Sequence, residues 1–175
     1  VRDHCHITQE YRGAACNTCN LKARTPKTVN CYFHNLTGYD SHPLMKAITE
    51  RAENGMPFMG WSAGANVACP SLRTTNDMPI FEPASFDTLE LIPFQINPHY
   101  LDANPEGHGG ETRQQRIEEF LAVNRGMKVA GLREASMLNI DGDKMTLLGA
   151  RDLRLFEFGK EPIEYTPDSD LSFLL

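Results

Sequence analysis

The chain has 175 residues, of which 41% are apolar, and it carries a net charge of −6. This length suffices for one domain with a core, and no stretch is typical of a signal peptide or a membrane span. We therefore expect a soluble, cytoplasmic protein without a membrane partner. The acidic balance argues against nucleic acid as the main partner, because phosphate binding requires a basic face.

Cysteine, histidine and charge are distributed unevenly along the chain. Four of the five cysteines and four of the six histidines lie in residues 1–42. Residues 1–50 hold six of the 17 Lys and Arg and four of the 23 Asp and Glu, which leaves eleven against nineteen for the remainder. Such asymmetry predicts two segments of different origin, namely an arm over residues 1–42 and a domain over residues 43–175.

Helices and strands are expected to alternate from residue 43 onward. Apolar side chains recur at helical spacing from Leu44 to Ala52, and Asn54-Gly55 provides a helix stop. The next expected elements are a strand over 57–60, a helix over 62–68, a loop over 73–86 and a strand over 89–96.

The carboxyl-terminal part carries clearer signals. A helix from Glu111 or Thr112 to Val123 is predicted because its apolar residues fall on one face. A strand is expected over 128–132. Asp141-Gly142 and Gly159-Lys160 favour tight turns, so we predict two hairpins that join 136–140 to 144–148 and 153–158 to 162–165. These elements indicate an α/β fold with C-terminal β-hairpins.

The segment Gly60-Trp-Ser-Ala-Gly64 matches the G-x-S-x-G pattern between a predicted strand and a predicted helix. The glycines permit a sharp turn that presents Ser62 at the start of the helix. There the backbone N–H of Ala63 can face a developing oxyanion. This context predicts a nucleophile elbow, and a glycine-rich turn without chemistry is the alternative.

A serine nucleophile requires a base and an orienting carboxylate. His99 and His108 are the two histidines of the second segment. His99 follows an apolar run and a proline, a fixed position where site residues gather, whereas His108 lies in a glycine-rich loop. Asp77 and Asp87 are the acidic candidates, and the composition does not choose between them.

Four blocks resemble, in order and spacing, the peptidase E family of aspartyl dipeptidases. They are Gly60-Trp-Ser-Ala-Gly-Ala-Asn-Val-Ala-Cys-Pro70, Arg73-Thr-Thr-Asn-Asp-Met-Pro-Ile80, Gln95-Ile-Asn-Pro-His99 and Gly110-Glu-Thr-Arg-Gln-Gln-Arg116. Members of that family cleave dipeptides with an N-terminal aspartate, using a Ser–His–Asp triad on an α/β fold without a metal. The resemblance implies Ser62 as nucleophile, His99 as general base and Asp77 as orienting acid. It also implies that Arg113 binds the acidic side chain of the substrate, and that Glu111 helps to bind its amino group.

The same resemblance implies an incomplete fold. The family places several βα units before the elbow, including a glycine-rich turn that supplies a second oxyanion N–H, whereas 59 residues precede Gly60 here. We therefore expect an incomplete three-layer sheet with an open edge, through which the chain can associate with another chain. Catalysis by the chain alone is expected to be weak.

The arm shows two further resemblances. Residues 3–20 resemble the His–metal finger of nucleases of the endonuclease VII type, in which Asp3, His4 and Asn20 would serve as metal ligands or base. Zinc would be held by Cys16 and Cys19, although the family's other cysteine pair is absent. Residues 33–42 resemble part of the proofreading exonuclease of family B DNA polymerases. We predict a small irregular finger-like or disordered arm, with zinc as its candidate cofactor.

Three functions follow from these patterns. The first is a serine dipeptidase that acts on small acidic dipeptides without a cofactor. The second is a metal-dependent DNA-binding or nuclease fragment built from residues 1–42. The third is an inactive remnant that associates with intact relatives through its sheet edge.

Overall fold

A computed structural model describes residues 2–4, 11–14, 41–77, 83, 85–104, 107 and 109–175. The chain forms two compact units, Val1–Leu36 and Thr37–Leu175. The boundary predicted after residue 42 therefore falls inside the second unit. In the first unit, strand β1 (Arg2–His4) pairs antiparallel with β2 (Tyr11–Ala14).

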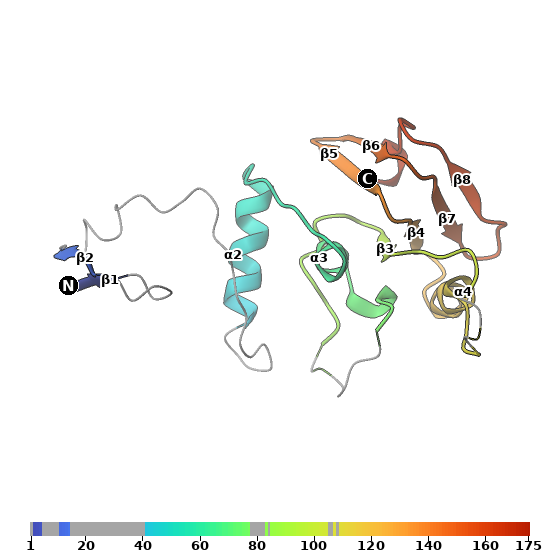
Figure 1. The fold of residues 1–175 in the computed structure, drawn as a ribbon, viewed down its shortest axis with the longest axis horizontal. Coiled ribbons are helices and arrows are strands. Elements are labelled where there is room, and N and C mark those ends of the chain that lie inside the picture. The colour runs from blue at the N-terminus through green and yellow to red at the C-terminus, as the bar shows by residue number, and fades with distance from the viewer. Residues whose placement is uncertain are drawn as a thin grey trace. The chain divides into compact units, whose positions relative to one another are not determined.

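The second unit contains a mixed sheet with the strand order β3-β4-β7-β8 and a separate hairpin, β5-β6 (Figure 1). Strands β3 and β4 are parallel, and the remaining pairs are antiparallel. The strands are β3 (Gln95–Pro98), β4 (Lys128–Leu132), β5 (Ser136–Asp141), β6 (Lys144–Gly149), β7 (Leu153–Glu157) and β8 (Ile163–Tyr165). The helices are α2 (Ser41–Glu53), α3 (Ala63–Ala68) and α4 (Arg113–Val123), with 3₁₀ turns η1 (Leu72–Thr74) and η2 (Ser172–Leu174). This arrangement confirms the α/β class.

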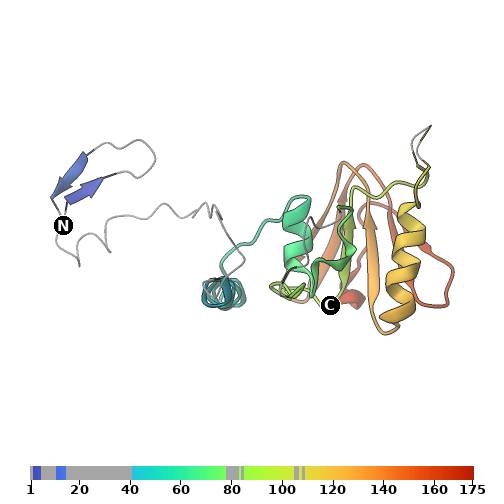
Figure 2. The same ribbon diagram turned by 90° about the horizontal axis from the view of Figure 1, so that it is seen from below.

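The sheet separates two apolar clusters because neighbouring residues of a strand point to opposite faces. Val129 of β4 packs in the cluster that contains Ile117 and Leu121 of α4. Its neighbour Ala130 packs in the cluster that contains Ala65 of α3. Figure 2 shows the strands between the two helices. The result is a three-layer arrangement.

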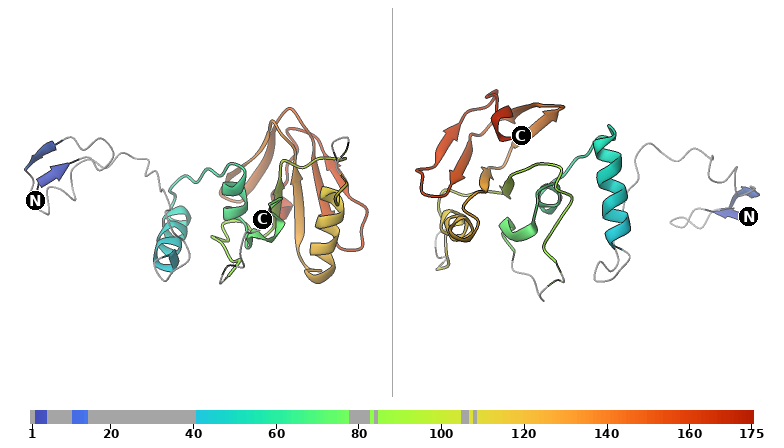
Figure 3. Two further views of the ribbon diagram at one scale, coloured as in Figure 1. Left: turned by 60° about the horizontal axis from the view of Figure 1, so that its bottom comes forward. Right: turned by 180° about the vertical axis from the view of Figure 1, so that it is seen from behind.

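The β5-β6 hairpin and the carboxyl terminus extend the core on the α3 side (Figure 3). Met145 and Leu147 of β6 are fully buried there, together with Leu171. The N–H of Leu171 donates to the carbonyl of Met145 over 2.8 Å. No helix in the described part of the chain is both long and apolar enough to cross a membrane.

The structure confirms the predicted elements that have strong local sequence signals. Helix α4 begins after Thr112, which forms a capping box with Gln115: the Thr112 hydroxyl accepts from the Gln115 N–H, and the Gln115 side chain accepts from the Thr112 N–H. Strand β4 covers the predicted range 128–132. Both C-terminal hairpins lie where their turn residues predicted them. Gly142 has a φ of 61°, which the first of these turns requires.

Two predicted strands were wrong in whole or in part. Residues 57–60 form no ladder with any described strand, and Met59 and Trp61 in and beside this segment are 94% and 81% exposed. Of the strand predicted over 89–96, only residues 95 and 96 lie in a strand, which is β3 and continues to Pro98. Strand formation depends on a partner, which local sequence does not specify.

The outer edge of β3 is covered by side chains. The Ile96 N–H donates to the Cys69 sulfur over 3.2 Å, and the Ile96 carbonyl accepts from Asn66 Nδ2 and Thr74 Oγ1, each over 2.8 Å. The Pro98 carbonyl accepts from Asn76 Nδ2 over 2.6 Å. Proline has no N–H to offer, so β3 presents no free main-chain group on this side. Association through an open sheet edge stays a prediction.

Candidate active site

Ser62 stands at a strained turn immediately before helix α3. Its backbone has φ 53° and ψ −116°, which non-glycine residues rarely adopt. The turn is tight because a Cβ on Gly60 would lie 2.8 Å from the Ala65 nitrogen and closer still to the Gly64 carbonyl. Strain of about 1–3 kcal/mol per such residue persists only where the surrounding structure enforces it, and it gathers at functional sites. The elbow geometry thus agrees with the G-x-S-x-G pattern.

The backbone N–H of Ala63 is available to a ligand. Ala63 is the first residue of α3, and no acceptor for its N–H occurs among the described residues. No side chain caps this end of the helix. A free N–H beside a serine oxygen is suited to stabilising the oxyanion of a tetrahedral intermediate.

His99 lies directly after β3 and is fixed by its neighbour. It has a φ of 55°, and the next residue, Tyr100, donates its N–H to the Leu132 carbonyl over 3.0 Å. The buried Tyr100 ring packs so closely against Gly131 that a Cβ on this glycine would lie 2.9 Å from the ring atoms. Glycine at residue 131 therefore allows Tyr100 to anchor the turn that carries His99.

The imidazole of His99 pairs with Glu134. Nδ1 of His99 lies in hydrogen-bonding contact with Oε1 of Glu134. A carboxylate only accepts hydrogen bonds, so Nδ1 carries the hydrogen and Nε2 retains a free lone pair. In this tautomer, Nε2 is the atom that can take a proton from a nucleophile.

Glu134 reaches His99 because β3 and β4 are parallel neighbours. Pro98, the last residue of β3, is paired with Leu132, the last residue of β4. Residues that follow the two strands therefore emerge side by side at the carboxyl edge of the sheet, where ligands bind in α/β proteins. Sequence reasoning overlooked Glu134, although this rule and the strand predicted over 128–132 contained the signal.

Asp77, the predicted orienting acid, is not bonded to His99 in the described part of the chain. Its segment is held elsewhere: Asn76 donates to Pro98 and accepts from Arg116 Nη1 at its carbonyl over 2.7 Å. Asp77 itself is exposed, and its charge acts on Arg113. In the structure His99 therefore pairs with Glu134 and not with Asp77, and the role of Asp77 as orienting acid stays a prediction. Asp87, the second acidic candidate, is exposed.

Ser62, His99 and Glu134 line one cleft of about 1000 Å³. Its lining includes residues 60–62, the ends of β3 and β4, and residues of the β5-β6 hairpin. Apolar side chains in this lining include those of Phe58, Met137 and Ile140. Ser62, His99 and Glu134 therefore border a common space. The alternative base His108 lies outside the described residues.

Arg113 and Glu111 lie at the start of α4. Burial, together with the nearby charge of Arg116, lowers the pKa of the Arg113 guanidinium, while Asp77 opposes that shift. Arginine remains charged at neutral pH despite such a shift. Glu111 is exposed in the preceding loop. Neither residue lines the cleft that holds Ser62.

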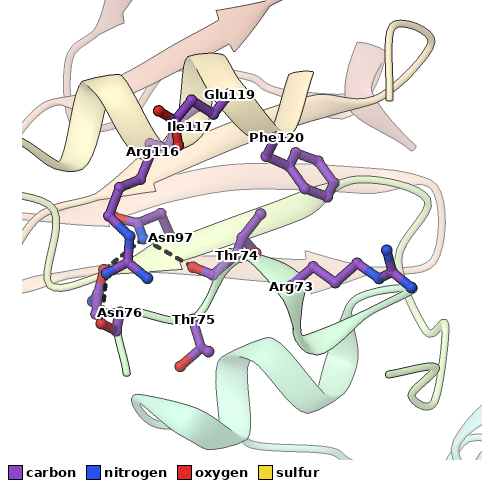
Figure 4. Close-up of a pocket in the computed structure, with 9 residues that line it drawn as sticks. All are labelled: Arg73, Thr74, Thr75, Asn76, Asn97, Arg116, Ile117, Glu119 and Phe120. Carbon is purple, nitrogen blue, oxygen red and sulfur yellow. Dashed lines mark hydrogen bonds between the residues drawn. The ribbon is translucent and has the colours of Figure 1, made fainter. Parts of the chain in front are cut away.

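A second, smaller pocket lies between η1 and α4 (Figure 4). It has a volume of about 320 Å³, and its lining comprises Arg73, Thr74, Thr75, Asn76, Asn97, Arg116, Ile117, Glu119 and Phe120. Asn97 donates through Nδ2 to the Thr74 carbonyl over 2.9 Å and to Asn76 Oδ1 over 2.7 Å. These bonds fix strand β3, which ends just before His99. None of Ser62, His99 and Glu134 lines this pocket.

Cys69 is a core residue. It is fully buried, and burial raises the pKa of its thiol to about 12. Its sulfur accepts the hydrogen bond from Ile96 and contacts the Ala65 carbonyl. A neutral, inaccessible thiol is a poor nucleophile, so Cys69 is no alternative to Ser62 as the candidate nucleophile.

The predicted metal ligands fall largely outside the described residues. Cys16, Cys19 and Asn20 are among those that the structure does not describe, and Asp3 and His4 are described only as backbone in β1. Among the described side chains, no group of three or more His, Cys, Asp and Glu could hold a metal ion. A zinc site in the arm stays a prediction.

Comparisons with known proteins identify relatives of the chain. The sequence model of peptidase family S51 matches residues 32–148. A protein named peptidase E from Nostoc sp. is 49% identical over 143 residues, which are 82% of this chain and 59% of the relative. A peptidase E from Streptomyces coelicolor is 56% identical over 133 residues, 75% of this chain and 54% of the relative. One from Pasteurella multocida is 49% identical over 121 residues, 69% of this chain and 52% of the relative.

The extent of these matches decides which family the chain belongs to. The family match includes residues 33–42, so the DNA-polymerase resemblance of that stretch has no support from the comparisons. The chain spans between half and three fifths of the length of these curated relatives. The family match nevertheless covers well over half of the chain. The chain therefore belongs to peptidase family S51.

Proposed function

We propose that this chain carries the catalytic centre of a serine-type dipeptidase, with Ser62 as nucleophile, His99 as general base and Glu134 as the acid that orients His99. The observation that carries the proposal is the pairing of His99 Nδ1 with Glu134 in the cleft that also holds the strained Ser62. A nucleophile, a base and an orienting third group are the parts that acyl transfer requires.

The reaction follows from these roles. His99 Nε2 takes the proton of the Ser62 hydroxyl while Oγ bonds to the carbonyl carbon of the scissile peptide. The Ala63 N–H donates to the resulting oxyanion. His99 then passes the proton to the leaving amine, the C–N bond breaks, and an ester on Ser62 remains. Water, deprotonated by His99, attacks that ester, and the acid product leaves as Ser62 regains its proton.

The chain alone is expected to turn over slowly. Oxyanion sites commonly use two donors, and Ala63 supplies one of them. Loss of one donor costs about a hundred- to a thousand-fold in turnover. Labelling of Ser62 with a small phosphonate is therefore a more sensitive readout of the triad than hydrolysis.

We further propose that the substrate is a dipeptide with an N-terminal aspartate. The support is the family resemblance, together with the partly buried guanidinium of Arg113. This guanidinium lies near Asp77, whose neighbour Asn76 donates to Pro98 at the end of β3. A planar guanidinium binds a carboxylate through two parallel hydrogen bonds. Glu111 would bind the amino group of the substrate.

Substitution of Arg113 tests the proposed specificity. Arg113→Met should reduce the preference for Asp-X over Ala-X dipeptides by about a hundred-fold or more, since each of the two charge-assisted hydrogen bonds contributes about 1.5–3 kcal/mol. Ser62 should stay reactive toward a neutral phosphonate. The measurement is the ratio of kcat/KM for the two dipeptides.

Arg113→Lys and Arg151→Met are the controls. Lysine keeps the positive charge but cannot donate two parallel hydrogen bonds to one carboxylate, so an intermediate preference is expected. Arg151 is exposed, and within the described part of the chain only its backbone makes hydrogen bonds, so its substitution should leave the ratio unchanged. Equal loss on both dipeptides in Arg113→Met would mean that Arg113 supports the fold rather than the specificity.

A further inference from the structure

Arg133 immediately precedes Glu134, and its side chain is enclosed by acceptors. Only 16% of the side chain is exposed. Its Nε and Nη2 donate to the two carboxylate oxygens of Asp102 over 3.0 and 2.5 Å. Its Nη1 and Nη2 donate to the two carboxylate oxygens of Glu164 over 2.8 and 3.0 Å, and Nη1 also donates to the Asp152 carbonyl over 2.8 Å. One guanidinium thus binds two carboxylates, each with two hydrogen bonds.

The Asp102 contact ties Arg133 to the loop that carries His99. Asp102 lies three residues after His99. Between them, Tyr100 donates its N–H to the Leu132 carbonyl, and the Arg133 guanidinium lies over the Tyr100 ring at 5.5 Å from its centre. The residues after β3 and the residues after β4 are therefore joined by main-chain, ionic and cation–π contacts.

The Glu164 contact connects the same guanidinium to β8, the edge strand of the sheet. Glu164 lies in β8, and Arg154 of β7 approaches both carboxylates, with N–O distances of 3.4 Å to Asp102 and 3.5 Å to Glu164. Hydrogen bonds from Arg133 hold the pKa of Asp102 below its ordinary value. Asp102 therefore stays ionised beside Arg133 at neutral pH.

A tight backbone turn follows Glu134, whose own side chain is 68% exposed. Ala135 has a φ of 62°, and its carbonyl accepts from the Ala150 N–H over 2.9 Å. Gly149 packs so closely against this turn that a Cβ there would lie 2.8 Å from the Ser136 Cα. Arg133 on one side and Ala135 on the other therefore hold Glu134 between two anchored residues.

We propose that Arg133 is a positioning residue, whose clamp on Asp102 and Glu164 holds the turn after β4 against the loop after β3 and so keeps Glu134 in contact with His99. This inference rests on the proposed function, because Glu134 is its orienting acid. Isolated surface ion pairs contribute little, but a largely buried, doubly bidentate guanidinium is geometrically specific. A displacement of about 1 Å in a catalytic group can cost about a hundred-fold in rate.

The test compares Arg133→Met and Arg133→Lys with the surface control Arg151→Met. Two quantities are measured on the full chain: the second-order rate of Ser62 labelling by a small neutral phosphonate, and the low-field proton resonance of the His99 Nδ1–H in ¹⁵N-histidine-labelled protein. His99→Gln assigns that resonance. We expect Arg133→Met to slow labelling about ten- to a hundred-fold and to remove the resonance. The labelling rate of Arg133→Lys should fall between those of Arg133→Met and the parent, because lysine cannot bind two carboxylates with two hydrogen bonds each.

Each outcome decides the proposal. Labelling by Arg133→Met at the rate of Arg151→Met, with the His99 resonance intact, would overturn it. If Arg133→Met does not fold, Asp102→Asn, which keeps the shape of the side chain, is judged by the same two readouts. If Ser62→Ala labels as fast as the parent, the proposed function fails. The His99 resonance in Arg133→Met still decides whether Arg133 positions Glu134.

Discussion

Glu134→Gln is expected to lower the rate of Ser62 labelling and of dipeptide hydrolysis by about 10⁴-fold, the loss seen when the orienting acid of a serine protease becomes its amide. Glutamine cannot stabilise the imidazolium that forms on His99, and its amide N–H can favour the wrong tautomer of the ring. The measurement is the second-order labelling rate with a small neutral phosphonate, because it needs no substrate side chain.

Asp77→Asn is the matched control, since it also replaces a carboxylate by its amide. Asp77 is exposed and makes no hydrogen bond to His99 within the described residues, so labelling should stay within about threefold of the parent. Hydrolysis of Asp-X is a less clean readout for this variant, because the Asp77 charge acts on Arg113. A greater loss of labelling in Asp77→Asn than in Glu134→Gln would restore Asp77 as the orienting acid.

Gly60→Ala is expected to destabilise the chain by more than about 4 kcal/mol and to abolish Ser62 labelling. The new Cβ would lie 2.8 Å from the Ala65 nitrogen and closer still to the Gly64 carbonyl. These are backbone atoms at the start of α3, so the clash cannot be relieved by a side-chain rotation. The measurement is the midpoint of urea denaturation together with the labelling rate.

Gly64→Ala provides the matched control within the same pentapeptide. A Cβ at residue 64 meets no atom within 4 Å, and the residue lies in helix α3. Alanine is favoured over glycine in a helix by about 1 kcal/mol, so this variant should be unchanged or slightly more stable. Equal destabilisation by both substitutions would contradict the elbow geometry.

Local signals predicted the elements that depend on local contacts. Helix α4 is specified by its capping box and apolar face, and the β5-β6 hairpin is specified by Asp141-Gly142 and alternating residues. The segment 57–60 is apolar like a strand but lacks a described partner, and most of 89–96 is not in a ladder. Pairing is a property of the whole fold, so a single stretch of sequence does not determine it.

The candidate site divides in the same way. Ser62 could be predicted because the elbow is a local pattern with a steric requirement at Gly60, and His99 because it follows an apolar strand. Glu134 is 35 residues away from His99 in the chain, and only the parallel pairing of β3 with β4 brings them together. The clamp at Arg133 is likewise formed by residues from separate strands and loops, so no motif could indicate it.

The most direct test of the central claim is mass spectrometry of the chain after incubation with a small neutral phosphonate. The proposed centre predicts one adduct per chain, attached to Ser62, that is absent in Ser62→Ala and in His99→Gln. An adduct on another residue, or labelling of His99→Gln at the rate of the parent, would contradict the assignment of Ser62, His99 and Glu134 to one catalytic centre.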